Sequence, residues 1–207
     1  MPGFDQMGSS KNYLLDGSPT QPFRTTIARE NVNGSVTLLT TVLYVFAIVV
    51  EAGDVFNHMA FIVKTQATAT VSHAWSAIYN GVGTGAALLA STSDVTAGWA
   101  AGAQDLSLSA TIANVPTVGT PQGGGTAAIV PSGPAVWGFA LYNVTSGTGT
   151  IVDGNAGGSL GGEIAVTGQV PLVSTATVSA TATAPAVLPT MAHSTVFGNV
   201  YGALTAK

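Results

Sequence analysis

Apolar and polar residues alternate along much of the chain with a period of two, which is the spacing of a β-strand. In residues 105–113, leucine, alanine and isoleucine alternate with serine, threonine and aspartate. Residues 135–145 follow the same period but carry apolar side chains on both faces. No window of the sequence shows the i, i+3, i+4, i+7 apolar pattern of an amphipathic helix. The chain is therefore predicted to be all-β.

Further strands and turns follow from β-branched and aromatic residues and from turn signals. Strands are predicted for residues 42–50, 55–65, 72–79, 86–93 and 194–205. Residues 51–54, with Gly53 at the third position, predict a hairpin between the first two of these strands, and Asn80-Gly81 predicts a second turn. Short strands with a turn signal about every ten residues indicate a β-sandwich or a jelly roll.

Residues 166–190 allow two interpretations. Threonine, serine, alanine, valine and proline make up nearly all of this segment. It could form one or two further strands inside the chain, with an edge interrupted by proline. Alternatively, it could be an extended strand presented to a neighbouring subunit, because small side chains allow close sheet packing. The sequence leaves both interpretations open.

Composition excludes several functions. Only 7% of the 207 residues are charged, whereas about 25% is usual in globular domains. A net charge of -4 with 5 Lys and Arg excludes a basic surface for nucleic acid or anionic membranes. The most apolar run, residues 36–50, is shorter than the roughly 20 residues of a membrane-spanning helix. Without cysteine there are no disulfides and no thiolate metal sites.

Charge is distributed unevenly, and this predicts two parts. Residues 1–34 are polar, contain several glycines and prolines, and have only scattered apolar side chains. We expect an extended N-terminal arm over residues 1–34, ordered only against another surface, and a β-sandwich body over residues 35–207. No signal peptide is expected, because an apolar core is missing near the N-terminus. The candidate docking residues of the arm are Phe4, Tyr13, Leu14, Leu15, Phe23, Arg24 and Arg29.

Candidate catalytic and ligand-binding residues are few. The three histidines stand apart in the sequence, and strand spacing places Asp54 and His58 about 13 Å apart, too far for a shared metal. The glycine-rich run at residues 81–85 favours a hairpin turn over a dinucleotide-binding loop, and no catalytic motif occurs. We expect no catalytic residues, no metal and no cofactor, and we rank an enzyme such as a cell-wall hydrolase last. Trp99, in the loop 96–102, is the aromatic residue best suited to an interface or to ligand stacking.

One resemblance covers a little over half of the chain. An aromatic strand, His73-Ala-Trp-Ser-Ala-Ile-Tyr79, is followed by Leu-Leu-Ala-Ser-Thr-Ser-Asp94 and by Gly98-Trp-Ala-Ala101. Leu-Ser-Leu108 and a long aromatic strand at 136–142 come next. In this order the motifs resemble a domain of structural proteins of tailed bacteriophages, particularly those of actinobacteria. The resemblance implies a minor tail, head-decoration or fibre-associated protein and supplies no catalytic residues; residues 1–34 lie outside it.

Together these observations lead to one expectation and one alternative. We expect a non-enzymatic structural protein of a tailed-phage virion, a surface decoration or minor tail component. It would form a homo-oligomer such as a trimer and attach through its N-terminal arm to capsid or tail subunits. It would be made in the host cytoplasm and lie on the virion surface, with no nucleic acid or membrane partner. The alternative is a carbohydrate- or receptor-binding sandwich at a tail tip or fibre, with a host surface glycan stacked on Trp99.

Overall fold

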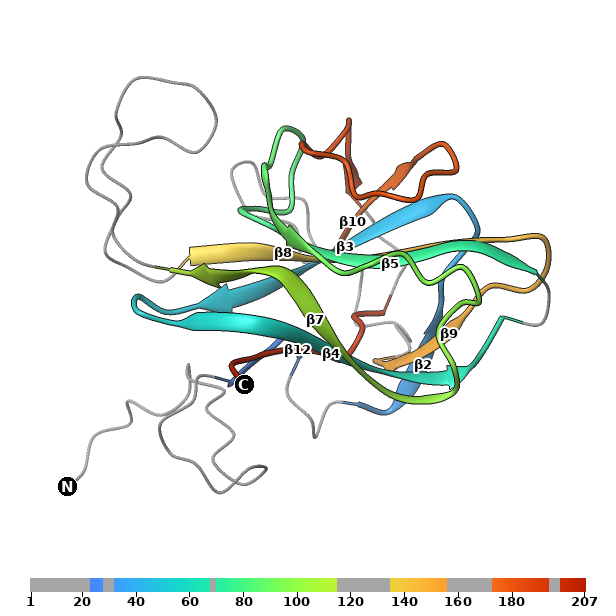
Figure 1. Ribbon diagram of the computed structural model, residues 1–207, viewed down its shortest axis with the longest axis horizontal. Coiled ribbons are helices and arrows are strands. Elements are labelled where there is room, and N and C mark those ends of the chain that lie inside the picture. The colour runs from blue at the N-terminus through green and yellow to red at the C-terminus, as the bar shows by residue number, and fades with distance from the viewer. Residues whose placement is uncertain (1–22, 28–31, 68–69, 115–134, 156–172, 194–197) are drawn as a thin grey trace.

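Two antiparallel β-sheets packed face to face form the body of the molecule (Figure 1). The computed structural model describes residues 23–27, 32–67, 70–114, 135–155, 173–193 and 198–207. Regular structure in these residues is entirely β, so the predicted all-β sandwich is confirmed. The strands are β1 (Phe23–Thr25), β2 (Gly34–Thr37), β3 (Val42–Val50), β4 (Val55–Thr65), β5 (Val71–Tyr79), β6 (Leu88–Ser91), β7 (Gly102–Ala113), β8 (Ala135–Thr145), β9 (Ile151–Gly154), β10 (Val173–Thr177), β11 (Ala192–His193) and β12 (Gly202–Thr205).

The first sheet, sheet A, is organised around β4. Strand β7 pairs with one edge of β4, while β12 and β9 pair with the other edge, one after the other along the strand. Strand β1 lies outside β12, and β2 lies outside β9. The second sheet, sheet B, has the order β11-β10-β3-β8-β5-β6. Most consecutive strands, such as β3 and β4 or β7 and β8, lie in different sheets.

The core lies between the two sheets and consists largely of alternate residues of the long strands. On β4 the buried side chains include Phe56, Met59, Phe61 and Val63, and β3 and β8 place their own alternate apolar residues opposite them. Such burial of apolar surface is the main stabilising contribution to a domain of this kind. Strands β3, β4 and β8 have the bounds that the sequence predicted from their β-branched and aromatic residues.

The predicted hairpin at residues 51–54 is wrong. Strand β3 belongs to sheet B and β4 to sheet A, so this connection is a corner that passes from one sheet to the other. Gly53, with φ +86°, adopts the left-handed conformation that suits either kind of turn. Strands β3 and β4 do not pair with each other, because each has a long partner elsewhere. Strand β3 pairs with β8 over eight residues, and β4 pairs with β7 along most of its length.

The other strand predictions hold in part. Strands β5 and β6 do pair antiparallel after Asn80-Gly81, but the connection is a wide loop and β6 spans only Leu88–Ser91. At the C-terminal end, β12 covers only Gly202–Thr205 of the strand expected over 194–205, and residues 194–197 lie outside the described residues.

A third layer covers the outer face of sheet B. We call residues 178–191 the covering segment; it follows β10 and runs across that face, where Figure 1 draws it in orange and red above β3 and β5. Together they enclose a second apolar cluster made of Leu43, Val45, Trp75, Ala77, Tyr79, Val82, Ala140, Tyr142 and Leu188. Strand β10 itself pairs with β3. For residues 173–190 the within-chain interpretation is therefore confirmed, while residues 166–172 lie outside the described residues.

Candidate functional site

A buried ion cluster joins β1 to the β3–β4 corner. Arg24 is 2% exposed, and its guanidinium donates from Nε to Asp54 Oδ2 at 2.5 Å and from Nη2 to Asp54 Oδ1 at 3.0 Å. Nη2 also lies 2.7 Å from Glu51 Oε2. Burial lowers the pKa of Arg24, but the hydrogen bonds and charges of Asp54 and Glu51 more than offset this and leave that pKa above its ordinary value. The guanidinium is thus charged and paired with both carboxylates.

Strand β1 is therefore part of the body, which corrects one expectation. Phe23 and Arg24 were expected in a docking arm, but both lie in sheet A, where β1 pairs with β12. Their partners are non-local in sequence, so no pattern within residues 1–34 could reveal them. The remaining candidate docking residues, Phe4, Tyr13, Leu14, Leu15 and Arg29, lie outside the described residues.

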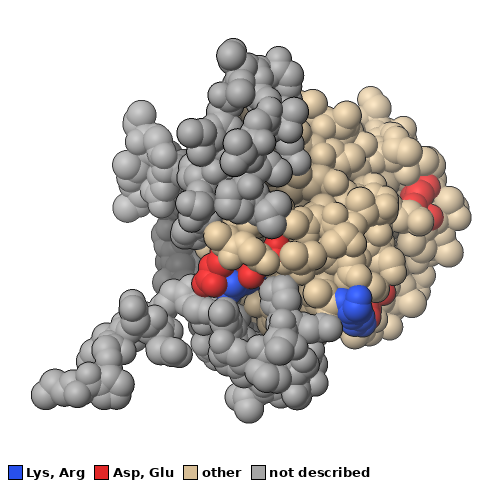
Figure 2. Space-filling model, turned by 60° about the vertical axis from the view of Figure 1, so that its left-hand side comes forward, with Lys and Arg blue, Asp and Glu red and all other residues tan. Residues whose placement is uncertain are grey.

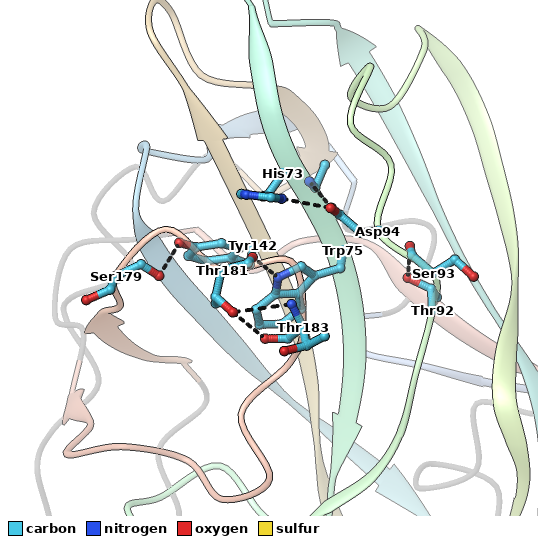
Figure 3. Close-up of polar contacts among 10 residues, drawn as sticks. His73, Trp75, Thr92, Ser93, Asp94, Tyr142, Ser179, Thr181 and Thr183 are labelled. Atoms are coloured by element: carbon cyan, nitrogen blue, oxygen red, sulfur yellow. Dashed lines mark hydrogen bonds and ion pairs between the residues drawn. The ribbon is translucent and has the colours of Figure 1, made fainter.

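Three aromatic side chains hold the covering segment on sheet B, and Figure 3 shows two of them, Trp75 and Tyr142. The Trp75 indole N–H donates to the carbonyl of Thr181 at 3.0 Å, and the Tyr142 hydroxyl donates to the carbonyl of Ser179 at 3.0 Å. Tyr79 donates in the same way to the carbonyl of Pro185 at 3.0 Å. The rings of Trp75 and Tyr142 stack with centroids 4.7 Å apart. This aromatic face is therefore filled by the chain's own segment and is not an open stacking surface for a ligand.

At one end of this face lies a histidine–carboxylate pair. His73 Nδ1 is 2.7 Å from Asp94 Oδ2, and the second oxygen of Asp94 accepts the Ala74 backbone N–H at 2.9 Å. Figure 3 shows the two side chains meeting between β5 and the segment after β6. Asp94 thereby ties that segment to the first residues of β5. In the described part of the chain, no group of three or more histidine and carboxylate residues gathers to hold a metal ion.

A second polar cluster lies across β4 and β7 in sheet A. His58 and Ser107 are directly opposite each other in the strand register, with Ser107 Oγ 3.1 Å from His58 Nε2. On the other side of the imidazole, Nδ1 lies 2.8 Å from Asn57 Oδ1. Asn57 is held in turn by Lys207, whose backbone N–H donates to Oδ1 at 2.9 Å and whose carbonyl accepts from Nδ2 at 2.8 Å. A hydroxyl, an imidazole and an amide thus form one chain of hydrogen bonds.

A register shift brings this cluster together. The pairing of β4 with β7 is irregular between Phe56 and His58, where β7 has more residues than β4 between the matched pairs. Such bulges re-aim side chains that strict alternation would send to opposite faces. Here Asn57 and His58, which are neighbours in sequence, contact each other beside Ser107. Sequence reasoning missed the cluster, because His58 stands alone in its segment and bulges leave no period-two signal.

Strand β7 presents a long surface of small side chains. Among the described residues its only strand partner is β4. Its exposed residues are Gly102, Ala103, Asp105, Ser107, Ser109, Ala110, Thr111 and Ala113. The one charge on this strand, Asp105, is paired with the Lys207 ammonium. Figure 2 shows that charged side chains occupy only a few small spots among the described residues on the face that it displays.

Trp99 does not lie where the sequence suggested. The expectation that it is exposed is wrong, because it is 1% exposed and its ring meets Phe61 edge-on with centroids 4.9 Å apart. Gly98, with φ +73°, turns the loop inward just before it. A large aromatic side chain contributes most when its apolar area is buried, and here the sandwich core provides that site. The glycan-binding alternative thereby loses its stacking residue.

Neither a comparison with protein-family models nor one with curated protein sequences finds a match to the chain. The resemblance to phage structural proteins therefore stays a prediction. Among the described residues, no helix has the length and apolar character needed to cross a bilayer.

Proposed function

We propose that this chain is a non-enzymatic structural protein of a tailed-phage virion, a surface decoration or minor tail component. It lies on the virion surface, forms a homo-oligomer and attaches to capsid or tail subunits through residues 1–22. The observation that carries this proposal is β7, a twelve-residue strand at a sheet edge. Its exposed side chains are small, and its single charge is already paired.

Such an edge is suited to contact with another subunit. Monomeric β-proteins usually protect their sheet edges with lysine, proline, short strands or a covering loop. Strand β7 contains no lysine or proline. Small uncharged side chains allow a second surface to approach closely without burying an unpaired charge. Repeated around a symmetric particle, even a modest contact of this kind becomes strong through multivalency.

The attachment role of residues 1–22 is supported by the way β1 is held. These residues lead directly into Phe23–Thr25, which pairs with β12 and is bound through Arg24 to the β3–β4 corner. Residues 1–22 can hold the sandwich on a scaffold only if the strand that follows them, β1, is firmly bound to the rest of the body. The buried ion cluster provides that binding, so binding through residues 1–22 would hold the whole sandwich on its scaffold.

The experiment that tests this proposal removes residues 1–22 and keeps β1. The truncated chain should fold, with the same circular dichroism and thermal unfolding as the full chain, and should form the same oligomer. It should be absent from virions of the encoding phage, as detected with antibody against the body. The full-length chain with the same tag is the control. Normal incorporation of the truncated chain would exclude this attachment role.

A further inference from the structure

We propose that Ser107 is an acyl-acceptor site, at which His58 acts as general base and Asn57 positions the base. The compounds that it would accept are activated acyl esters, those with a good leaving group. This inference goes beyond the structural role proposed above, and a single acylation of the chain is compatible with that role. It rests on the Ser107–His58–Asn57 chain of hydrogen bonds.

The hydrogen bonds of Asn57 determine which nitrogen of His58 carries the proton. Asn57 Nδ2 donates to the Lys207 carbonyl at 2.8 Å, and Asn57 Oδ1 accepts the Lys207 backbone N–H at 2.9 Å. Exchange of the two amide atoms would oppose donor to donor and acceptor to acceptor. The atom beside His58 Nδ1 is therefore an oxygen, which can only accept. In neutral His58 the proton lies on Nδ1, and Nε2 has the free electron pair.

With this tautomer the Ser107 hydroxyl donates to Nε2. A hydroxyl nucleophile is activated when it donates its hydrogen bond to a base and when a third group orients that base. The Oγ–Nε2 distance of 3.1 Å is within the range for proton transfer in such pairs. Ser107 is exposed, so an ester can reach its Oγ. Asn57 acts through His58 and is a positioning residue.

The reaction balances without a redox partner. Ser107 Oγ forms a bond to the carbonyl carbon of the ester while its proton passes to His58 Nε2. The bond from that carbon to the leaving oxygen then breaks, and the electron pair goes to the leaving oxygen. His58 returns the proton to this oxygen, which yields acyl-Ser107 and a free alcohol or phenol.

Other serines of the chain serve as comparators. Ser109 is exposed on the same strand, but its Oγ accepts the Ser91 backbone N–H at 3.2 Å. Ser72 is exposed on β5. General-base assistance is worth about 10²–10⁴-fold in rate. Ser107 should therefore be acylated at least about 100-fold faster than Ser72 or Ser109, neither of which bonds to an imidazole among the described residues.

The test treats the full chain with p-nitrophenyl acetate and locates acetyl groups by peptide mass spectrometry over time. In the wild type, Ser107 should be acetylated first among the serines. Ser107→Ala should abolish that product, and His58→Gln should slow it about 100-fold. Asn57→Ala should slow it, because His58 then loses the oxygen that holds the proton on Nδ1. Ser72→Ala is the matched control and should leave acetylation of Ser107 unchanged.

Three results would overturn the proposal. The first is acetylation of Ser107 no faster than that of Ser72 and Ser109. The second is an unchanged rate at Ser107 in His58→Gln, with circular dichroism showing that the variant is folded. The third is acetylation confined to lysine side chains, Lys207 included. A merely structural hydrogen bond between Ser107 and His58 would give the first two results, and it would leave the rate at Ser107 unchanged in Asn57→Ala.

Discussion

Arg24 and Asp54, thirty residues apart in sequence, are joined by two hydrogen bonds between guanidinium and carboxylate. Both side chains are almost completely shielded from water. Asp54 Oδ2 also accepts the Glu51 backbone N–H at 2.8 Å, so the same carboxylate shapes the corner between the two sheets. One pair of residues therefore holds the first strand of the body and the passage from sheet B to sheet A.

Breaking this pair should destabilise the fold strongly. Removal of one partner of a buried ion pair leaves the other charge buried and uncompensated, which costs about 3–5 kcal/mol. We expect Arg24→Ala to lower the free energy of unfolding by this amount, measured by urea denaturation. Asp54→Ala should lower it by less, because Arg24 then keeps Glu51 as an ion partner. Lys64→Ala is the control, because Lys64 and Asp153 are 3.9 Å apart and the lysine is largely exposed. That variant should lose less than about 1 kcal/mol.

Trp99 allows a direct test of structural against ligand-binding roles. Because its ring is buried against Phe61, Trp99→Ala should destabilise the protein by about 3–5 kcal/mol. Trp99→Phe retains an aromatic ring in the core and should cost less. Thermal and urea unfolding measure both variants. A Trp99→Ala variant as stable as the wild type would contradict the buried position and restore the residue as a candidate for ligand stacking.

The same residue shows how far sequence reasoning could go. Apolar runs rich in β-branched and aromatic residues predicted β3, β4 and β8 with their observed bounds, because such side chains suit strands. They could not place Trp99, since a residue in a glycine-containing loop has no period that indicates which side it faces. They could not assign β3 and β4 to different sheets either, because pairing depends on partners far away in sequence. The Ser107–His58 contact depends on a bulge and was invisible for the same reason.

Buried phenols should make the fold sensitive to strong alkali. Burial raises the pKa of Tyr79, Tyr142 and Tyr44 above the ordinary value of 10.0, and the shift is large for Tyr79. The stabilising contribution of each is complete below pH 10 and is lost as the pH rises toward the folded-state pKa, because the unfolded chain then releases the proton first. One pH unit above 10, Tyr79 alone should lower the free energy of unfolding by about 1.4 kcal/mol.

Urea denaturation at about pH 8 and about pH 11 measures this loss, and ultraviolet absorbance of tyrosinate follows ionisation directly. Tyr79→Phe is the informative variant. It cannot ionise, so its loss of stability between the two pH values should be smaller than that of the wild type. The opposite result, with Tyr79 ionising in the folded protein near pH 10, would mean that the covering segment does not shield its hydroxyl.

The proposed oligomer should resist salt. Contacts between surfaces with few charges depend on apolar burial and packing, whereas ion pairs at a surface are screened within about 3 Å at 1 M salt. We expect the oligomer to keep its mass in analytical ultracentrifugation from low salt to about 1 M salt.

A charge on an exposed residue of β7 should weaken the proposed oligomer. We expect this of Thr111→Lys, because lysine on an edge strand opposes sheet-edge association. The matched control Thr37→Lys lies on β2, away from β7, and should leave the mass unchanged. Dissociation of the wild type by salt would show that charge pairs hold the subunits together, and a monomer at all salt concentrations would remove the basis for the proposed structural role.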